Sequence, residues 1–206
     1  RVLFPSPEPS SKPAADPRVA FLSFIGSAKV GWNLRSKLAP GARCALEHGG
    51  VAPVIVAADA DLDYAVPLLT KGGFYHAGQV CVSVQRIYAA RKIADALAAR
   101  IAEASKKLVV GDPTLAATEV GPLIDPAEVD RVESWVNEAL AGGAELLCGG
   151  KRLPNNCYAP TVLLNPMPDA KVSTQEVFGP VVCVYAYDEI DAAISAVSTP
   201  TIATVV

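Results

Sequence analysis

The sequence predicts an α/β protein in which a largely parallel β-sheet carries helices on its faces. Short apolar runs, typical of buried strands, alternate along the chain with amphipathic stretches whose apolar residues recur at helical spacing. Glycine, proline and capping residues separate the two kinds of segment. Because parallel strands need a crossover connection that is usually a helix, this alternation favours a parallel sheet. The chain shows no internal repeat.

The first elements form a strand, a turn and a helix. Residues 1–17 hold five prolines, which fix φ and remove backbone donors, so we expect an extended arm or loop there. The apolar run 19–24 predicts a buried strand, and Gly26-Ser27 forms the turn after it. A helix then ends at Pro40-Gly41. Three residues form its apolar face: Val30, Leu34 and Leu38. This pattern is half of a βαβ unit.

Two strand–helix pairs follow. Residues 54–57 predict a buried strand, after which Asp61 or Asp63 caps a helix that contains Pro67 near its start. Residues 84–89 predict the next strand, and residues 91–108 a long amphipathic helix. Its apolar stripe consists of Ile93, Leu97, Ile101 and Leu108.

The last elements are a well-delimited helix and two strands. Asp125-Pro126 is a strong helix start, since the carboxylate caps and proline suits the first position. Gly142-Gly143 ends this helix. Its inner face consists of Val129, Val132, Val136 and Leu140. Strands at 145–148 and 181–187, and a helix from Asp188, complete the pattern.

Composition excludes several classes of protein. Hydrophobic residues make up 51% and charged residues 19% of the chain, which is too apolar for a disordered protein. No run approaches the ~18 apolar residues that cross a bilayer. The net charge of −3 and the pI near 5.4 predict neither a nucleic-acid nor an acidic-membrane surface.

The cysteines indicate neither zinc nor a disulfide framework. No Cys-x-x-Cys spacing occurs, and the chain has two histidines. A chain this long and apolar does not need disulfides, so we expect reduced thiols in a cytoplasmic protein. The first residues form no apolar signal core. The five cysteines are Cys44, Cys81, Cys148, Cys157 and Cys183.

Two glycine-containing stretches in the first quarter of the chain could carry function. In FIGSAKVG (24–31), a glycine and a hydroxyl at a strand-to-helix turn let N–H groups face a phosphate; the alternative is an ordinary capped helix. In LEHGG (46–50), a carboxylate stands beside two glycines, which suggests a cleft where backbones approach closely. The alternatives are a surface acid at Glu47 and a packed histidine at His48.

Two further stretches carry a thiol and a carboxylate. In GQVCVSVQR (78–86), Cys81 lies between a helix end and a strand, a place where loops hold reactive groups. The alternative is an inert packed cysteine, the interpretation that we keep for the other four. In EVFGP (176–180), Glu176 and Phe178 could contact a sugar and an aromatic ring; the alternative is an acidic turn with a core phenylalanine.

Together, the four stretches resemble the aldehyde dehydrogenase superfamily in order and spacing. That family has a phosphate-contacting Gly-Ser turn, a LELGG-type glutamate motif, a GQxCxxxxR-type cysteine motif and an E-x-F-G-P motif. Here Cys81 comes 34 residues after Glu47, and Glu176 comes 95 residues after Cys81. The connecting segments VAPVIV, DLDYAV and VVGDPTLAATEVGPLID also fit. The resemblance extends from about residue 17 to about residue 195.

The resemblance implies a fold, an activity and a set of site residues. Residues 1–48 would be the last piece of a Rossmann-like dinucleotide-binding domain, and residues 49–206 a catalytic domain incomplete at its C-terminus. Cys81 would be the nucleophile that turns a small aldehyde into a thiohemiacetal and then a thioester, and Glu47 the general base for hydrolysis. The cofactor would be NAD or NADP, with no metal. The residues implied in cofactor binding are Phe24 and Val30 (adenine), Gly26 and Ser27 (pyrophosphate), Glu176 (ribose), and Phe178 and His48 (nicotinamide).

The departures from the family pattern define the alternatives. The family's first βαβ segments and an oxyanion-hole asparagine would lie upstream of this sequence, which leaves the Cys81 N–H as oxyanion donor. Loss of one donor costs about 10²–10³ in rate, so we expect a fragment with little activity alone. Gln175 replaces a common acid, and the stretch 198–202 comes sooner than in the family. By analogy we expect a homo-oligomer, a dimer or tetramer. The alternatives are a non-catalytic remnant or interaction module, and cofactor-independent ester hydrolysis by Cys81 and Glu47.

Overall fold

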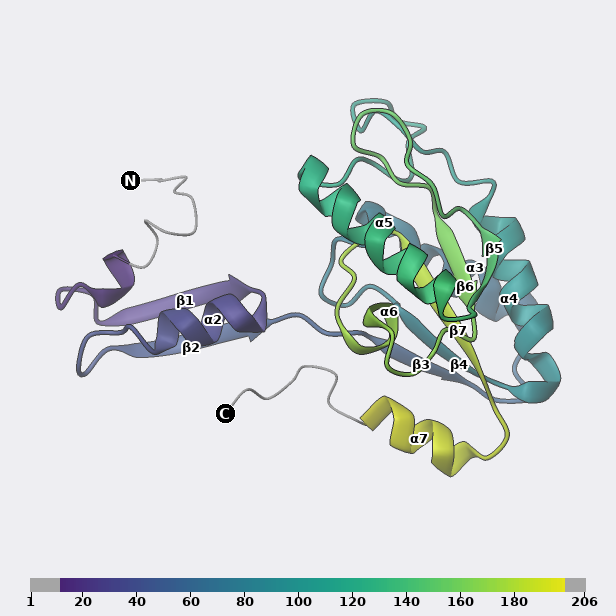
Figure 1. The fold of residues 1–206 in the computed structure, drawn as a ribbon, viewed down its shortest axis with the longest axis horizontal. Helices are drawn as coiled ribbons and strands as arrows, with labels where there is room; N and C mark the ends of the chain where they lie inside the picture. The colour runs from purple at the N-terminus through teal and green to yellow at the C-terminus, as the bar shows by residue number, and fades with distance from the viewer. Residues whose placement is uncertain (1–11, 199–206) are drawn as a thin grey trace. The chain divides into compact units, whose positions relative to one another are not determined.

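The computed structural model describes residues 12–198 and divides the chain into two compact units, Arg1–Gly49 and Gly50–Val206. Figure 1 shows the elements of each unit. Most prolines of the predicted N-terminal arm and the stretch 199–202 lie outside the described residues. The described end of the arm is not extended, because residues 12–15 form one helical turn. Pro13 lies in the first turn of a helix, where its missing N–H has no intrahelical partner to lose.

The first unit is a complete βαβ unit. It consists of β1 (Phe21–Gly26), α2 (Ala28–Arg35) and β2 (Arg43–His48). The two strands pair in parallel, with Phe21 opposite Arg43 and Gly26 opposite His48. The sequence pattern predicted the strand, the turn and the helix but not β2, whose residues carry few β-favouring side chains. Pairing with β1 therefore makes the 43–48 segment a strand.

The two-stranded sheet is less buried than the apolar run predicted. The residues of β1 alternate between exposed and half-buried, and Ile25 is 79% exposed. The alternation arises because α2 packs on β1 and β2 from one side. Leu34 is buried on α2, but Val30 is 38% exposed and the helix ends at Arg35, so the predicted apolar face is only partly realised.

The second unit contains a five-stranded sheet of order β3-β4-β7-β6-β5. All neighbouring strands pair in parallel except β5 and β6, which confirms the predicted, largely parallel sheet. The strand β6 escaped prediction because a short apolar run has no period that distinguishes strand from helix. The five strands are β3 (Pro53–Val56), β4 (Arg86–Ala90), β5 (Glu145–Cys148), β6 (Thr161–Leu164) and β7 (Val181–Tyr187).

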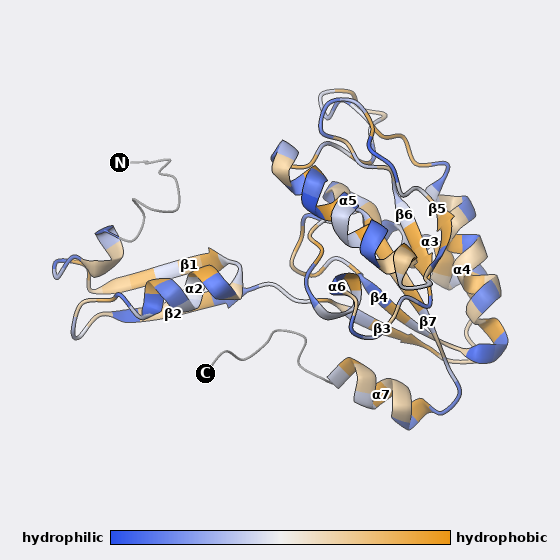
Figure 2. Ribbon diagram, in the orientation of Figure 1, coloured by the Kyte–Doolittle hydropathy of each residue, from blue (hydrophilic) through white to orange (hydrophobic). Residues whose placement is uncertain are grey.

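Helices cover both faces of this sheet (Figure 1). On one face lie α3 (Leu62–Phe74) and α4 (Arg91–Ser105), and on the other lie α5 (Pro126–Ala141) and the short α6 (Lys171–Thr174). The last helix, α7 (Ile190–Ser198), contacts β3 and β7. Figure 2 shows the hydrophobic central strands between helices with hydrophilic outer faces.

The core forms between these layers. Ile87 of β4 and Leu97 and Ile101 of α4 are fully buried. Burial of one such side chain stabilises the fold by about 1.5–3 kcal/mol. The helix α4 ends three residues before Leu108, which packs on the core from beyond the helix.

The predicted helix caps are confirmed. Asp61 caps α3, since its carboxylate accepts the Asp63 N–H at 2.9 Å. Asp125 caps α5 by accepting the Ala127 N–H at 2.8 Å. At the other end of α5, Gly142 is the C-cap. Pro67 lies inside α3, whose helical hydrogen bonding continues to Phe74.

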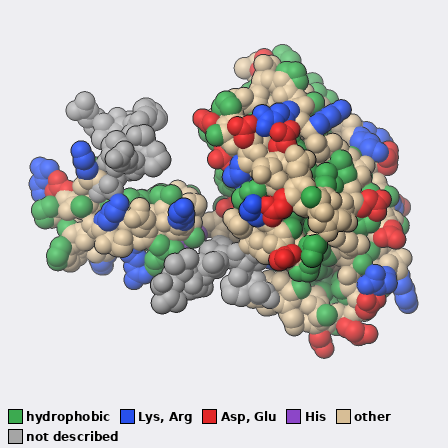
Figure 3. Space-filling model, in the orientation of Figure 1, with side chains coloured by type: hydrophobic (Ala, Val, Ile, Leu, Met, Phe, Trp, Pro, Cys, Tyr) green, Lys and Arg blue, Asp and Glu red, His purple; other side chains and the backbone are tan. Residues whose placement is uncertain are grey.

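Charged side chains of both signs are interspersed on the visible face of the second unit (Figure 3). Several form exposed ion pairs, such as Arg91 with Asp188, which contribute little to stability because water screens them. Within residues 12–198, no helix has the length and apolar character to cross a membrane.

Candidate active site

Cys81 lies at the tip of a tight turn between α3 and β4. The 3₁₀ segment η1 (Tyr75–Gly78) follows α3, and the Ser83 N–H then donates to the Val80 carbonyl at 2.9 Å. This hydrogen bond places Cys81 and Val82 at the two central positions, where both are exposed. The Ser83 hydroxyl donates to the carbonyl of Gly72 at 3.2 Å, which fastens the turn to the end of α3.

The environment of the thiols separates Cys81 from the other cysteines. Cys148, Cys157 and Cys183 are buried and Cys44 is half-buried, whereas Cys81 is exposed. Burial raises the pKa of the Cys148 and Cys157 thiols, and it raises the pKa of Cys183 to about 12. Because the thiolate is the nucleophile, these three buried groups are poor candidates.

The backbone before Cys81 contacts the EVFGP segment directly. Gly78 has φ +70°, and a Cβ atom there would lie 2.1 Å from the Gly179 carbonyl oxygen. Glycine is therefore required both by backbone conformation and by close approach. His76 and Ala77 also have positive φ, 50° and 56°. Such backbone strain costs about 1–3 kcal/mol per residue and is concentrated at functional sites.

Glu176 connects this segment to the end of LEHGG. Its carboxylate accepts the Gly50 N–H at 3.2 Å. Burial raises the pKa of this half-buried carboxyl group, and the Gly50 N–H and the Arg131 guanidinium oppose that rise. A Cβ atom on Gly50 would lie 3.9 Å from the Cys81 carbonyl oxygen. The end of LEHGG, the cysteine motif and the EVFGP segment thus meet within the second unit.

A small pocket marks their meeting point. Phe178 on its rim is 41% exposed and has a left-handed backbone, with φ +46°. The pocket is lined by Gly50, Gly78, Val80, Ser83, Gln85, Glu176, Phe178, Gly179 and Val181.

The first unit gathers several of the other predicted residues at one end of its sheet. The Phe24 ring lies over Gly26, since a Cβ atom on Gly26 would be 2.7 Å from Phe24 Cζ. Ser27 is the N-cap of α2, but its side chain makes no capping hydrogen bond. Ser27 thus occupies the N-cap position, as the alternative of an ordinary helix start expects, but without the side-chain hydrogen bond of a capped helix.

His48 ends β2 beside α2. Its ring is edge-on to Trp32 with centroids 5.6 Å apart, and its buried Nε2 has no hydrogen-bond partner. A Cβ on Gly31 would lie 2.3 Å from this nitrogen. Glu47, the preceding residue of β2, is exposed. It belongs to the first unit and Cys81 to the second, so their pairing stays a prediction.

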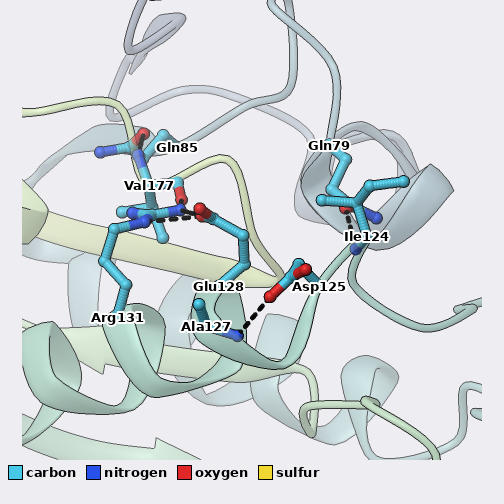
Figure 4. Close-up of polar contacts among 8 residues, drawn as sticks. All are labelled: Gln79, Gln85, Ile124, Asp125, Ala127, Glu128, Arg131 and Val177. Atoms are coloured by element: carbon cyan, nitrogen blue, oxygen red, sulfur yellow. Dashed lines mark hydrogen bonds and ion pairs between the residues drawn. The ribbon is translucent and has the colours of Figure 1, made fainter. Parts of the chain in front are cut away.

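Two glutamines of the cysteine motif have roles that the sequence did not show. The Gln79 amide donates to the Pro122 carbonyl at 3.1 Å and accepts the Ile124 N–H at 2.9 Å. The Gln85 amide is buried and accepts the Val177 N–H at 2.8 Å (Figure 4). For Gln85, the sequence did contain a signal of such a role: a glutamine stands directly before a buried strand, where an apolar residue is usual.

Arg131 of α5 also contacts this segment. Its guanidinium donates to the Val177 carbonyl at 2.7 Å and pairs with Glu128 on the same helix (Figure 4). Among residues 12–198, no three His, Cys, Asp or Glu side chains are grouped as metal ligands would be. The candidate reactive groups of this site are the exposed Cys81 thiol and the half-buried Glu176 carboxylate.

The fold and the site define an α/β protein with an exposed cysteine turn beside a half-buried glutamate. A family model described as the aldehyde dehydrogenase family matches residues 6–201. The chain therefore belongs to the aldehyde dehydrogenase family.

Individual relatives agree with this assignment. The chain is 46% identical to 3-sulfolactaldehyde dehydrogenase of Priestia aryabhattai over 180 residues, which cover 87% of the chain and 37% of that protein. It is 39% identical to the NADP(+) succinate-semialdehyde dehydrogenase GabD of Escherichia coli, covering 86% of the chain and 38% of that protein. The structure of an NAD-dependent aldehyde dehydrogenase from Sinorhizobium meliloti superposes with a TM-score of 0.88 at 37% identity, covering 92% of this chain and 39% of that one. The chain thus spans less than two fifths of the length of these curated relatives.

Proposed function

We propose that the chain carries the cysteine region of an NAD(P)⁺-dependent aldehyde dehydrogenase, which oxidises an aldehyde to a carboxylic acid through Cys81. The observation that supports this most strongly is the convergence of Gly50, the Cys81 turn and Glu176 around one pocket. In this proposal residues 1–48 belong to a dinucleotide-binding domain and residues 49–206 to the catalytic domain.

Cys81 is the nucleophile. A free thiol of pKa about 8.5 is only about 3% ionised at pH 7, so this step requires activation of the thiol by a base or by its environment. The thiolate attacks the aldehyde carbon, a C–S bond forms, and the carbonyl oxygen becomes an oxyanion that the Cys81 N–H stabilises. Loss of a hydride from this carbon, for which bound NAD(P)⁺ would be the acceptor, turns the oxyanion into the carbonyl oxygen of a thioester. Glu47 takes a proton from water, which attacks the thioester; the C–S bond breaks and the carboxylic acid leaves.

The residues assigned to the cofactor fit its chemistry. The amino end of α2 has no side-chain cap, and such ends bind phosphate through free N–H groups and the helix dipole. The Glu176 carboxylate suits ribose hydroxyl groups, and the exposed Phe178 ring suits the nicotinamide end. When bound, NAD(P)⁺ supplies the hydride acceptor. The complete proposed set is Phe24, Gly26, Ser27, Val30, His48, Glu176 and Phe178.

The first substrates to try are the aldehydes for which the relatives are named, both the acidic ones and the cationic betaine aldehyde. Two relatives are named for 3-sulfolactaldehyde and succinate semialdehyde, each of which has one aldehyde and one acidic group. A cytoplasmic setting belongs to the proposal because it keeps Cys81 reduced. By family analogy, so does assembly into a homodimer or homotetramer.

The test is aldehyde-dependent formation of NAD(P)H by this polypeptide and by its Cys81→Ala variant. We expect slow turnover that the substitution abolishes, together with a change in the rate of Cys81 alkylation by iodoacetamide when NAD(P)⁺ is added. Absence of both effects would overturn the proposal and favour an interaction module, for which the exposed Phe21 and Ile25 of β1 are the supporting observation. Turnover of an activated ester that is unchanged in Cys81→Ala would exclude thiol-dependent ester hydrolysis.

A further inference from the structure

The side chain of Gln85 is buried, and all its hydrogen bonds go to one backbone segment. Its Nε2 donates to the carbonyls of Val172 at 2.8 Å and Gln175 at 2.7 Å, and its Oε1 accepts the Val177 N–H at 2.8 Å. The exposed fraction of Gln85 is 5%. A primary amide has two N–H donors and one carbonyl oxygen, and here each of these groups has a partner.

These hydrogen bonds lie on both sides of Glu176. The Gln175 carbonyl belongs to the peptide group before Glu176, and the Val177 N–H belongs to the peptide group after it. Holding both peptide groups restricts φ and ψ of Glu176 and so the direction in which its carboxylate leaves the backbone. The Gly50 N–H donates to that carboxylate at 3.2 Å.

The residue after Glu176 is held from a second side. The Val177 carbonyl accepts the Arg131 guanidinium at 2.7 Å, so both polar backbone groups of Val177 have side-chain partners (Figure 4). Phe178 follows in a left-handed conformation that non-glycine residues avoid. Such strain persists only where neighbouring contacts over-determine the backbone.

From this arrangement we infer that Gln85 is a positioning residue, which aims the Glu176 carboxylate and the Phe178 ring at the cofactor. The inference rests on the proposed function, because it takes Glu176 and Phe178 as cofactor-binding residues. Gln85 comes four residues after Cys81, so one short segment carries the nucleophile and orients the cofactor carboxylate. An apolar side chain would fill the same space without requiring three polar partners, but it would leave Glu176 without this restraint.

The test is the Gln85→Met variant, which keeps side-chain length and removes the amide. The first readout is the NAD(P)⁺ concentration that half-maximally changes the iodoacetamide reactivity of Cys81. The second is the rate at which para-nitrophenyl acetate acylates Cys81, a reaction in which the thiolate forms a C–S bond and nitrophenolate leaves. We expect the half-effective concentration to rise about tenfold, the size of one misaligned hydrogen bond to a charged group, while acylation changes less than about threefold.

Gln79→Met is the matched control. Gln79 is in the same motif, and its amide also makes three hydrogen bonds, but they go to the His76 and Pro122 carbonyls and the Ile124 N–H. We expect this variant to slow acylation of Cys81 and to leave the half-effective NAD(P)⁺ concentration within about twofold of the unsubstituted chain. If Gln85→Met does not fold, Gln85→Asn, which retracts the amide by one methylene group, is expected to shift the concentration in the same direction.

The outcomes separate the two proposals. If NAD(P)⁺ has no effect on Cys81 in the unsubstituted chain, and no NAD(P)H forms, the proposed function fails. If NAD(P)⁺ acts there and the folded Gln85 variant responds at the same concentration, the positioning role is overturned and the proposed function stands. Equal shifts in Gln85→Met and Gln79→Met would also overturn it, since a general loosening of the unit would then explain the data.

Discussion

The contact between the cysteine and EVFGP segments predicts a severe effect of Gly78→Ala. Two costs add at this position. An L-residue at φ +70° costs about 1–2 kcal/mol relative to glycine. The new Cβ would also lie 2.1 Å from the Gly179 oxygen, against a normal C···O contact of about 3.3 Å, so one backbone must move by roughly 1.2 Å.

The packing around Gly179 prevents its backbone from moving away from the new methyl group. A Cβ on Gly179 would lie 2.8 Å from Cγ2 of Val132, which is fully buried, so the EVFGP backbone is already packed against α5. Overpacking of this kind costs about 1–3 kcal/mol. The expected total loss in the free energy of unfolding is therefore about 2–5 kcal/mol, a large part of the 5–15 kcal/mol typical of a domain.

Urea unfolding followed by circular dichroism measures this loss, with Gly143→Ala as the control. Gly143 has φ +96°, and a Cβ atom there would meet no atom within 4 Å, so only the conformational cost of about 1–2 kcal/mol applies. Equal losses in the two variants would refute the steric argument. It would then follow that the two segments do not approach as closely as the structure indicates.

Three other predictions concern single groups. Iodoacetamide should modify Cys81 at least about tenfold faster than the buried Cys183, whose thiol has a pKa of about 12; equal labelling in peptide mass maps of the folded protein would contradict this. Burial raises the pKa of Glu176, so ionisation of this carboxyl group opposes folding as the pH rises above its pKa in the unfolded chain, about 4.3. The Glu176→Gln variant should therefore gain stability relative to the unsubstituted chain between pH 4 and pH 7. A difference in urea midpoints that does not change with pH would disprove this prediction. Asp125→Ala should lose about 1 kcal/mol by removing the cap of α5, while Asp125→Asn keeps most of it; equal midpoints for the two variants would exclude capping as the cause.

Local features of the sequence were sufficient to predict those helices and strands whose starts and ends are marked by a few neighbouring residues. The start of α5 follows from Asp125-Pro126 and its end from Gly142, because caps and helical period act over single turns. The strand β7 was predicted with its observed bounds, since its apolar run is long and bounded by turn residues. In contrast, β2 has no distinctive period and becomes a strand by pairing with β1.

The candidate site divides in the same way. Its chemistry was visible in the sequence, because a cysteine, two glutamates and their glycines occur in a recognisable order. Their geometry was not, because it depends on contacts between residues about 100 positions apart, such as Gly78 with Gly179 and Gln85 with Val177. The sequence by itself therefore determined the fold class, and it supplied the candidate thiol and carboxylates. The tertiary structure alone decided that Gln85 holds the Glu176 segment, because no local pattern records which distant backbone groups a buried amide will meet.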